Sequence, residues 1–297
     1  MARWLLAFMA LAWAVAGGPA AAEEKIHVVA TFSILADLAK NVGGDRIEVT
    51  PLVGADGDVH AYTPSPADAK RLADANVVVL NGLGLEGWME RLVKASGTKA
   101  AMAVASTGVK PRQMDEDDGR PHTDPHAWQS VANAKIYVAN IRDALVKADP
   151  SAKSTYETNA SSYLSRLDAM DKEITQSLAA IPAERRKIIT THDAFGYFGA
   201  AYRVQFIAPQ GVSTETEVSA RDVARIIRQI KTQKIPAVFM ENISDPRLME
   251  RIAKESGAKI GGKVYSDALS PAGGPAATYI DMMKNNLREF LGALTTS

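Results

Sequence analysis

The chain has 297 residues, with 34 basic and 34 acidic side chains and no cysteine. This balance excludes the basic field on which nucleic-acid binding depends, and no basic amphipathic helix suggests a membrane surface as partner. Small ligands and other proteins therefore remain as partners. The lack of cysteine excludes disulfides and a lipid-modified cysteine.

The first 22 residues predict a signal peptide. Arg3 precedes an apolar run at 4–16, and the alanines at 20–22 form a typical cleavage site before Glu23. The apolar run is too short for a membrane-spanning helix. We therefore expect an exported, soluble, periplasmic chain of residues 23–297, with 33 basic and 34 acidic side chains after Arg3 is removed.

An internal duplication organises the mature chain. Residues 77–99 align without a gap to residues 237–259, and eight of the 23 positions are identical. Both segments have the pattern of an apolar strand, a loop and an amphipathic helix that ends at glycine. The segments before them match as well. Helices that begin with serine are predicted at 65–76 and 219–235, and strand–helix–strand units at 27–49 and 188–207. Alternating strands and helices predict an α/β fold of two pseudo-symmetric lobes with mainly parallel sheets.

Residues 131–180 predict connecting helices between the two copies. The segment is rich in alanine, lacks glycine and is interrupted by Pro150. Beyond Pro150, we expect a long, rigid helix of about 28 residues, which at 1.5 Å per residue spans roughly 40 Å and passes both lobes. A short helix should precede it. The apolar residues at helical spacing are Tyr156, Tyr163, Leu167, Met170 and Ile174. The expected division is an N-terminal lobe at 23–130, connecting helices at 131–180 and a C-terminal lobe at 181–297.

One motif competes with this interpretation. The segment GLGLEG at 82–87 fits the glycine pattern of dinucleotide-binding loops, follows a predicted strand and precedes a predicted helix. However, no acid lies between Glu90 and Asp115, where the ribose-binding carboxylate belongs, and the duplicated copy at 242–247 has no glycine. We therefore reject a nucleotide site.

Three histidines and one aspartate stand at predicted strand ends or in loops. His60 lies in DVHAYTPSPAD, His126 in DPHAW and His192 in IITTHDAF, and Asp267 follows an apolar run before SPAGGP. In open α/β sheets, ligands bind beyond the carboxyl ends of the strands, which here places a site between the lobes. Three imidazoles and a carboxylate complete a zinc tetrahedron, and a closed site favours holding metal over catalysis. We predict that these four residues bind one metal ion.

The surroundings of this site allow further predictions. Asp193, Glu215 or Glu241 are candidates to accept hydrogen bonds from the ligand rings. His27, inside a predicted strand, is interpreted as structural. The acidic segment 114–122 is expected to be a solvated loop; in the alternative interpretation it is a mobile arm in which His122 captures metal and passes it inward.

These motifs together resemble the metal-binding receptors of zinc and manganese ABC importers, of the ZnuA and TroA type. The resemblance covers nearly all of 25–297 and includes NGLGLEGWME, GVSTETEVSARD and YSDALSPAGGPAATYIDMM. It implies two lobes joined by a long helix, little lobe closure and delivery of metal to a membrane permease. It assigns the ligand role to His60, His126, His192 and Asp267; manganese receptors of the family commonly have Glu at the position of His192.

The resulting hypothesis is a monomeric, periplasmic, high-affinity receptor that delivers Zn²⁺ to an ABC importer permease and is not an enzyme. A periplasmic metallochaperone is a second partner that we consider. Within the class, a Mn²⁺ or Fe²⁺ receptor is the alternative, because imidazole binds several metals. Alternatives from other classes are a zinc hydrolase, in which the pair His192–Asp193 would act, and a metal-dependent adhesin.

Overall fold

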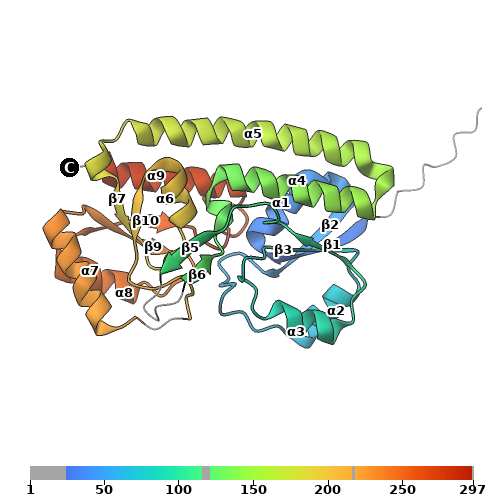
Figure 1. Cartoon of the computed structure of the whole chain (residues 1–297), viewed down its shortest axis with the longest axis horizontal. Helices are drawn as coiled ribbons and strands as arrows, with labels where there is room; N and C mark the ends of the chain where they lie inside the picture. Colours follow the sequence, from blue (N-terminus) through green and yellow to red (C-terminus); the bar gives the residue numbers. More distant parts are fainter. Residues whose placement is uncertain (1–24, 116–120, 216–217, 296–297) are drawn as a thin grey trace, which may run out of the picture.

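The structure is a computed structural model that describes residues 25–115, 121–215 and 218–295 (Figure 1). The signal peptide expected at 1–22 lies outside the described residues. Within those ranges, every helix is too short or too polar to span a bilayer.

Two four-stranded parallel sheets form the centres of two lobes. The strand order is β2-β1-β3-β4 in the first lobe and, from the equivalent edge, β8-β7-β9-β10 in the second. Strands that the duplication aligns therefore hold the same place in both sheets, and the predicted two-lobed α/β fold is confirmed. The strands of the first sheet are β1 Ile26–Phe32, β2 Ile47–Val53, β3 Val77–Leu80 and β4 Ala101–Val104. Those of the second are β7 Lys187–Ile189, β8 Gln205–Ile207, β9 Ala237–Glu241 and β10 Lys259–Val264.

Helices cover both faces of each sheet (Figure 1). The inner face of the first sheet packs against α1 (Ser33–Gly43) and α4 (Val131–Ala148), and that of the second against α6 (Gly196–Tyr202) and α9 (Tyr279–Thr295). The outer faces carry α2 (Pro66–Ala73) with α3 (Met89–Ser96), and α7 (Ala220–Gln233) with α8 (Arg247–Ser256). Ser65 and Ser219 cap α2 and α7, as the Ser-led pattern predicts.

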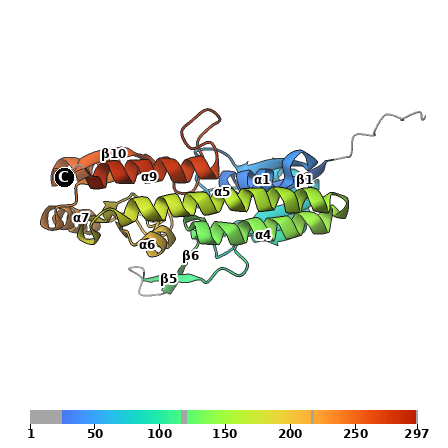
Figure 2. The same ribbon diagram turned by 90° about the horizontal axis from the view of Figure 1, so that it is seen from above.

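The helix α5 (Lys153–Ala179) is 27 residues long and runs along both lobes, as Figures 1 and 2 show. All five apolar residues predicted to form its inner stripe are buried. The preceding helix, α4, is longer than the short helix that we expected, with 18 residues. Nothing before Pro150 interrupts the helical pattern, so α4 continues to Ala148, two residues before the proline. The boundaries at 130 and 180 stay a prediction.

One continuous hydrophobic core joins the lobes. It contains side chains from the first sheet, from α4 and α5, and from α6 and α9 of the second lobe. A separate, smaller cluster lies beneath α7 and α8. Because apolar burial stabilises in proportion to the area removed from water, separating the lobes would expose part of the shared core.

The acidic segment is not the solvated loop that we expected over its whole length. Its two ends form an antiparallel hairpin, β5 (Arg112–Asp115) and β6 (Pro121–Asp124), in which Met114 pairs with His122. The expectation failed because neither end shows the alternation of apolar and polar residues by which half-buried strands are identified. Residues 116–120 lie outside the described part of the chain.

A half-buried carboxylate joins the first lobe to the start of α9. Asp37 of α1 accepts a hydrogen bond from the backbone N–H of Tyr279, at 2.9 Å. Burial raises the pKa of Asp37 from 3.8 to about 6, although the hydrogen bonds from Tyr279 and Asn41 oppose the rise. The folded protein therefore binds a proton at Asp37 more tightly than the unfolded chain does.

This difference makes the contribution of Asp37 to stability fall as pH rises. The contribution is fully present below pH 3.8 and is lost as pH passes about 6. Each pKa unit corresponds to about 1.4 kcal/mol, so the loss is about 3 kcal/mol. Between pH 4 and 7, the free energy of unfolding of the metal-free wild type, measured with urea, should fall by this amount relative to that of Asp37→Asn. A difference between the two proteins that does not change with pH would contradict the assignment.

Candidate metal centre

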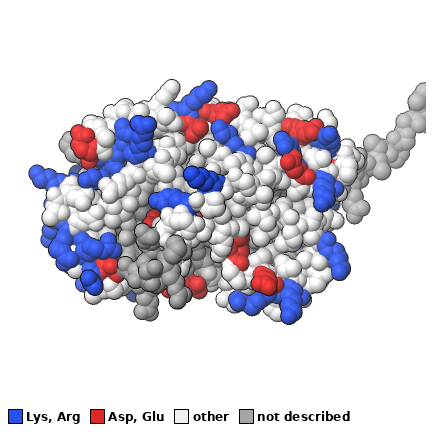
Figure 3. All heavy atoms as spheres, in the orientation of Figure 1, with Lys and Arg blue, Asp and Glu red and all other residues white. Residues whose placement is uncertain are grey.

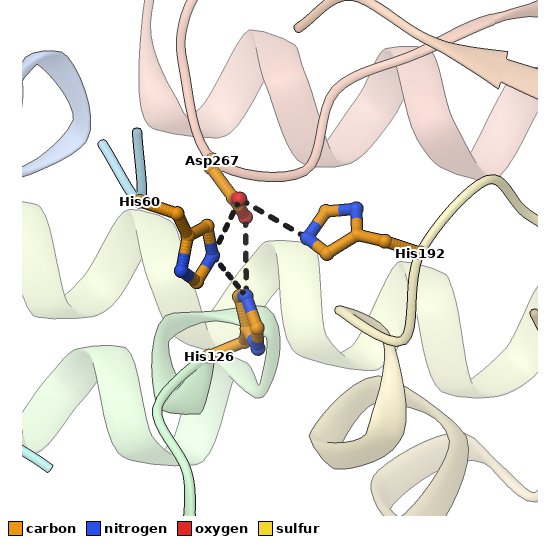
Figure 4. A group of neighbouring side chains, drawn as sticks. All are labelled: His60, His126, His192 and Asp267. Carbon is orange, nitrogen blue, oxygen red and sulfur yellow. Dashed lines mark hydrogen bonds and ion pairs between the residues drawn. The ribbon is translucent and has the colours of Figure 1, made fainter. Parts of the chain in front are cut away.

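The four residues predicted as metal ligands meet between the lobes (Figure 4). His60 lies in the loop after β2, and His126 lies two residues beyond the end of β6. In the second lobe, His192 follows β7, and Asp267 lies three residues beyond the end of β10. The second lobe and the first thus contribute two side chains each, from segments that the sheets bring to the central cleft.

The distances within the cluster fit a single tetrahedral ion. Nε2 of His60 lies 3.1 Å from Nε2 of His126 and 3.2 Å from Oδ2 of Asp267. Oδ2 of Asp267 is also 3.1 Å from Nε2 of His192, and Oδ1 is 3.6 Å from Nε2 of His126. Ligand atoms bonded to zinc at 2.0–2.2 Å stand about 3.3–3.6 Å apart in a tetrahedron. All four ligand atoms lie within 4.8 Å of one another.

The cluster is buried, and its polar atoms lack ordinary hydrogen bonds. His126, His192 and Asp267 are fully buried. Both carboxylate oxygens of Asp267 and both ring nitrogens of His192 have contacts at ion-pair distance but no partner with hydrogen-bond geometry. Asp267 therefore does not cap the turn that follows it. Buried polar atoms without hydrogen bonds are costly, and a shared cation would satisfy them together.

The electrostatics of the cluster attract positive charge. Burial raises the pKa of Asp267, but the charges of His192 and His126 and the close contacts of its oxygens with the His192 and His60 rings hold that pKa well below its usual range. Burial lowers the pKa of His192, yet the carboxylates of Glu241 and Asp267 raise it well above its usual range. A metal ion bound by Nε2 of His192 would take the place of a proton there.

Two carboxylates orient two of the rings. Oδ1 of Asp124 lies 2.9 Å from Nδ1 of His126, and Oε2 of Glu241 lies 2.6 Å from Nδ1 of His192. Glu241 also accepts the backbone N–H groups of Thr191 and His192. Such contacts fix the ring so that Nε2 faces the ligand position.

The sequence identified Glu241 as a candidate for this role but missed Asp124. Within the described ranges, no hydrogen bond or ion pair joins Asp193 or Glu215 to a ring of the cluster. Asp124 stands two residues before His126, with Pro125 between them, and this spacing was the available signal. The turn at Pro125 brings the Asp124 carboxylate back to the backbone N–H and the ring of His126.

Hydrogen bonds join the lobes next to the cluster. The carbonyl of Ser266, beside Asp267, accepts from the indole of Trp128 at 2.9 Å and from the side-chain amide of Gln129 at 2.7 Å. The hydroxyl of Tyr279 donates to the carbonyl of Trp128 at 2.6 Å. The Trp128 ring also packs edge-on against His126, with centroids 5.3 Å apart. These contacts fix Asp267 relative to His126.

The segment that resembles a dinucleotide loop supports the cluster instead. The buried carboxylate of Glu86 accepts the backbone N–H groups of Asn81 and Gly82 and the hydroxyl of Thr31. Asn81 in turn donates to the carbonyl of Pro125, directly before His126, at 2.9 Å. The loop is thus closed around its own glutamate.

The remaining histidines lie outside the cluster. His27 is exposed at the start of β1, 3.8 Å from Glu48, and its structural role stays a prediction. His122 lines a cavity of about 850 Å³ together with His60 and Glu215. The cavity leads to the most accessible ring of the cluster, and metal capture by His122 stays a prediction.

Comparison with known proteins identifies the family. The family model described as ZnuA, zinc-uptake complex component A, periplasmic, matches residues 28–293. The manganese-binding lipoprotein MntA of Halalkalibacterium halodurans is 36% identical over 92% of this chain and 89% of its own. The iron-binding protein YfeA of Yersinia pestis is 34% identical over 89% of this chain and 85% of its own.

Solved structures agree with this assignment. The periplasmic zinc-binding protein TroA of Treponema pallidum superposes with a TM-score of 0.86 at 30% identity, over 91% of this chain and 99% of TroA. A manganese-bound periplasmic metal-binding protein of Candidatus Liberibacter asiaticus gives a TM-score of 0.81 at 30% identity, over 91% of this chain and all of its own. The chain therefore belongs to the ZnuA family of substrate-binding receptors of metal ABC importers, and it is a receptor rather than an enzyme.

Proposed function

We propose that this protein is a periplasmic, high-affinity zinc receptor that delivers Zn²⁺ to the membrane permease of an ABC importer, with His60, His126, His192 and Asp267 as ligands. The observation that carries the proposal is the convergence of these four side chains, from both lobes, on one buried point. The absence of a free coordination position suits a protein that holds its cargo and releases it to a partner.

The composition of the ligand set supports zinc. Three neutral imidazoles and one carboxylate suit zinc in both number and softness, whereas Mn²⁺ prefers oxygen ligands and a larger coordination number. The family resemblance associates manganese receptors with Glu at the position that His192 occupies here. A Mn²⁺ or Fe²⁺ receptor is the second candidate, because relatives bear the names manganese-binding MntA and iron-binding YfeA.

The test of the metal is the elemental content of the protein isolated from its native periplasm. We expect one equivalent of zinc per chain. Added Zn²⁺ at about 100 times its dissociation constant should stabilise the metal-free protein by about 2.7 kcal/mol, which raises the melting temperature. Manganese or iron as the bound metal would support the second candidate, and a protein that binds no divalent metal would contradict both.

A second test separates the ligand role of Asp267 from a structural one. Asp267→Ala removes the only anionic ligand. Loss of a side chain that merely orients a ligand typically weakens metal binding by about 10- to 100-fold, so the loss of zinc affinity in Asp267→Ala should be larger than that. Stability of the metal-free protein should stay near normal, since neither oxygen makes a hydrogen bond. Calorimetry and thermal unfolding measure both quantities. His27→Ala, far from the cluster, is the control; reduced stability with unchanged affinity in Asp267→Ala would contradict the ligand role.

The proposed location is the periplasm, reached through a signal peptide cleaved after Ala22. It is supported by the apolar run at 4–16 and by the family model, which is described as periplasmic. The curated relatives include lipoproteins, whereas the 297 residues contain no cysteine for a lipid. Intact-mass measurement of the periplasmic protein should give a chain that starts at Glu23. A larger mass, or recovery only from the membrane fraction, would contradict this location.

A further inference from the structure

The first residue of α6, Gly196, is buried against the hairpin of the other lobe. A Cβ atom at Gly196 would lie 2.6 Å from Oδ2 of Asp124 and 3.0 Å from Cζ of Arg112. Arg112 and Asp124 are directly opposite each other in the β5–β6 hairpin. Nonbonded heavy atoms pack at about 3.5–4.0 Å, so the hairpin leaves no space for a side chain at Gly196.

The next residue of α6 holds the same hairpin. The hydroxyl of Tyr197 accepts the backbone N–H of Arg112 at 2.8 Å and lies 3.4 Å from the carbonyl of Lys110, to which it donates. The start of α6 therefore contacts the hairpin through a hydrogen bond and through close packing. Because α6 belongs to the second lobe and Asp124 precedes His126 in the first, this contact links one lobe to a ligand of the other.

Asp124 has little freedom to move away from Gly196. Its Oδ1 accepts both the backbone N–H of His126, at 2.9 Å, and the ring nitrogen Nδ1 of His126, at 2.9 Å. Its Oδ2, the atom that faces Gly196, has no hydrogen-bond partner, and the residue is fully buried. Any shift of Oδ2 turns the carboxylate and disturbs the two bonds that orient the His126 ring.

We propose that Gly196 is a positioning residue for metal binding. Its missing side chain lets α6 pack directly on Asp124 and keeps that carboxylate in the orientation that directs Nε2 of His126 into the cluster. This inference rests on the proposed metal-binding function. It assigns to the second lobe an influence on a ligand of the first that does not pass through the metal.

The same helix provides a matched control. A Cβ at Gly199 would lie 2.6 Å from the carbonyl oxygen of Val204, and its three nearest atoms all belong to Val204 and Phe206 of its own lobe. Both glycines lie within α6 and outside the set with positive φ, so alanine adds crowding at each without backbone strain. The two substitutions thus differ in the atom they displace.

The experiment compares Gly196→Ala with Gly199→Ala in the mature protein, by zinc calorimetry and by the visible absorption of bound Co²⁺. We expect Gly196→Ala to bind Zn²⁺ at least about tenfold more weakly, the scale for lost support of a ligand, and to change the Co²⁺ spectrum. Gly199→Ala should keep the wild-type affinity and spectrum while losing stability. Equal affinities and spectra for wild type and Gly196→Ala would overturn the inference.

A double-mutant cycle tests the route through Asp124 and remains informative if Gly196→Ala folds poorly. Asp124→Ala removes the crowded oxygen, so adding Gly196→Ala to it should leave zinc affinity unchanged and should restore folding. An equal loss of affinity from Gly196→Ala with and without Asp124 would overturn the inference. Absence of metal binding by the wild type would instead overturn the proposed function and this inference with it.

Discussion

The buried carboxylate of Asp267 is the group on which the organisation of the metal cluster depends. It lies at ion-pair distance from three imidazole rings of three other segments, and its oxygens have no hydrogen-bond partner. A buried charge is tolerated only when it is paired, so the segments that carry the rings must be held around it. The cross-lobe bonds to the Ser266 carbonyl, next to Asp267, provide part of that constraint.

The lobes can hold such a site because they are not independent bodies. The shared core and the long helix α5 connect them along one side. At the surface, Figure 3 shows basic and acidic side chains spread over both lobes in that view, without a continuous field of one sign. The attraction for a cation is therefore local: it comes from Asp267 and Glu241 on either side of His192. The local attraction for a cation thus depends on the arrangement of the two lobes that brings these side chains together.

Much of this could be predicted from sequence. The duplication defined the two sheets, and residues at predicted strand ends or in loops gave all four members of the cluster. Parallel strands bring their carboxyl ends to one edge, which explains the positions of His192 and Asp267 after β7 and β10. Three features were not predicted. The supporting role of Asp124 depends on a turn at Pro125, the hairpin lacks an alternating pattern, and the packing of Gly196 on Asp124 joins residues that are distant in the chain. The Gly196 contact is tertiary, and the turn at Pro125 and the hairpin leave little trace in local periodicity.

The most direct test of the central claim is the anomalous scattering of zinc in a crystal of the metal-loaded protein. The account predicts one strong peak between the lobes, bonded at about 2.0–2.2 Å to Nε2 of His60, His126 and His192 and to a carboxylate oxygen of Asp267. A peak at another location, or a zinc ion there whose fourth ligand is water while Asp267 points away, would contradict it.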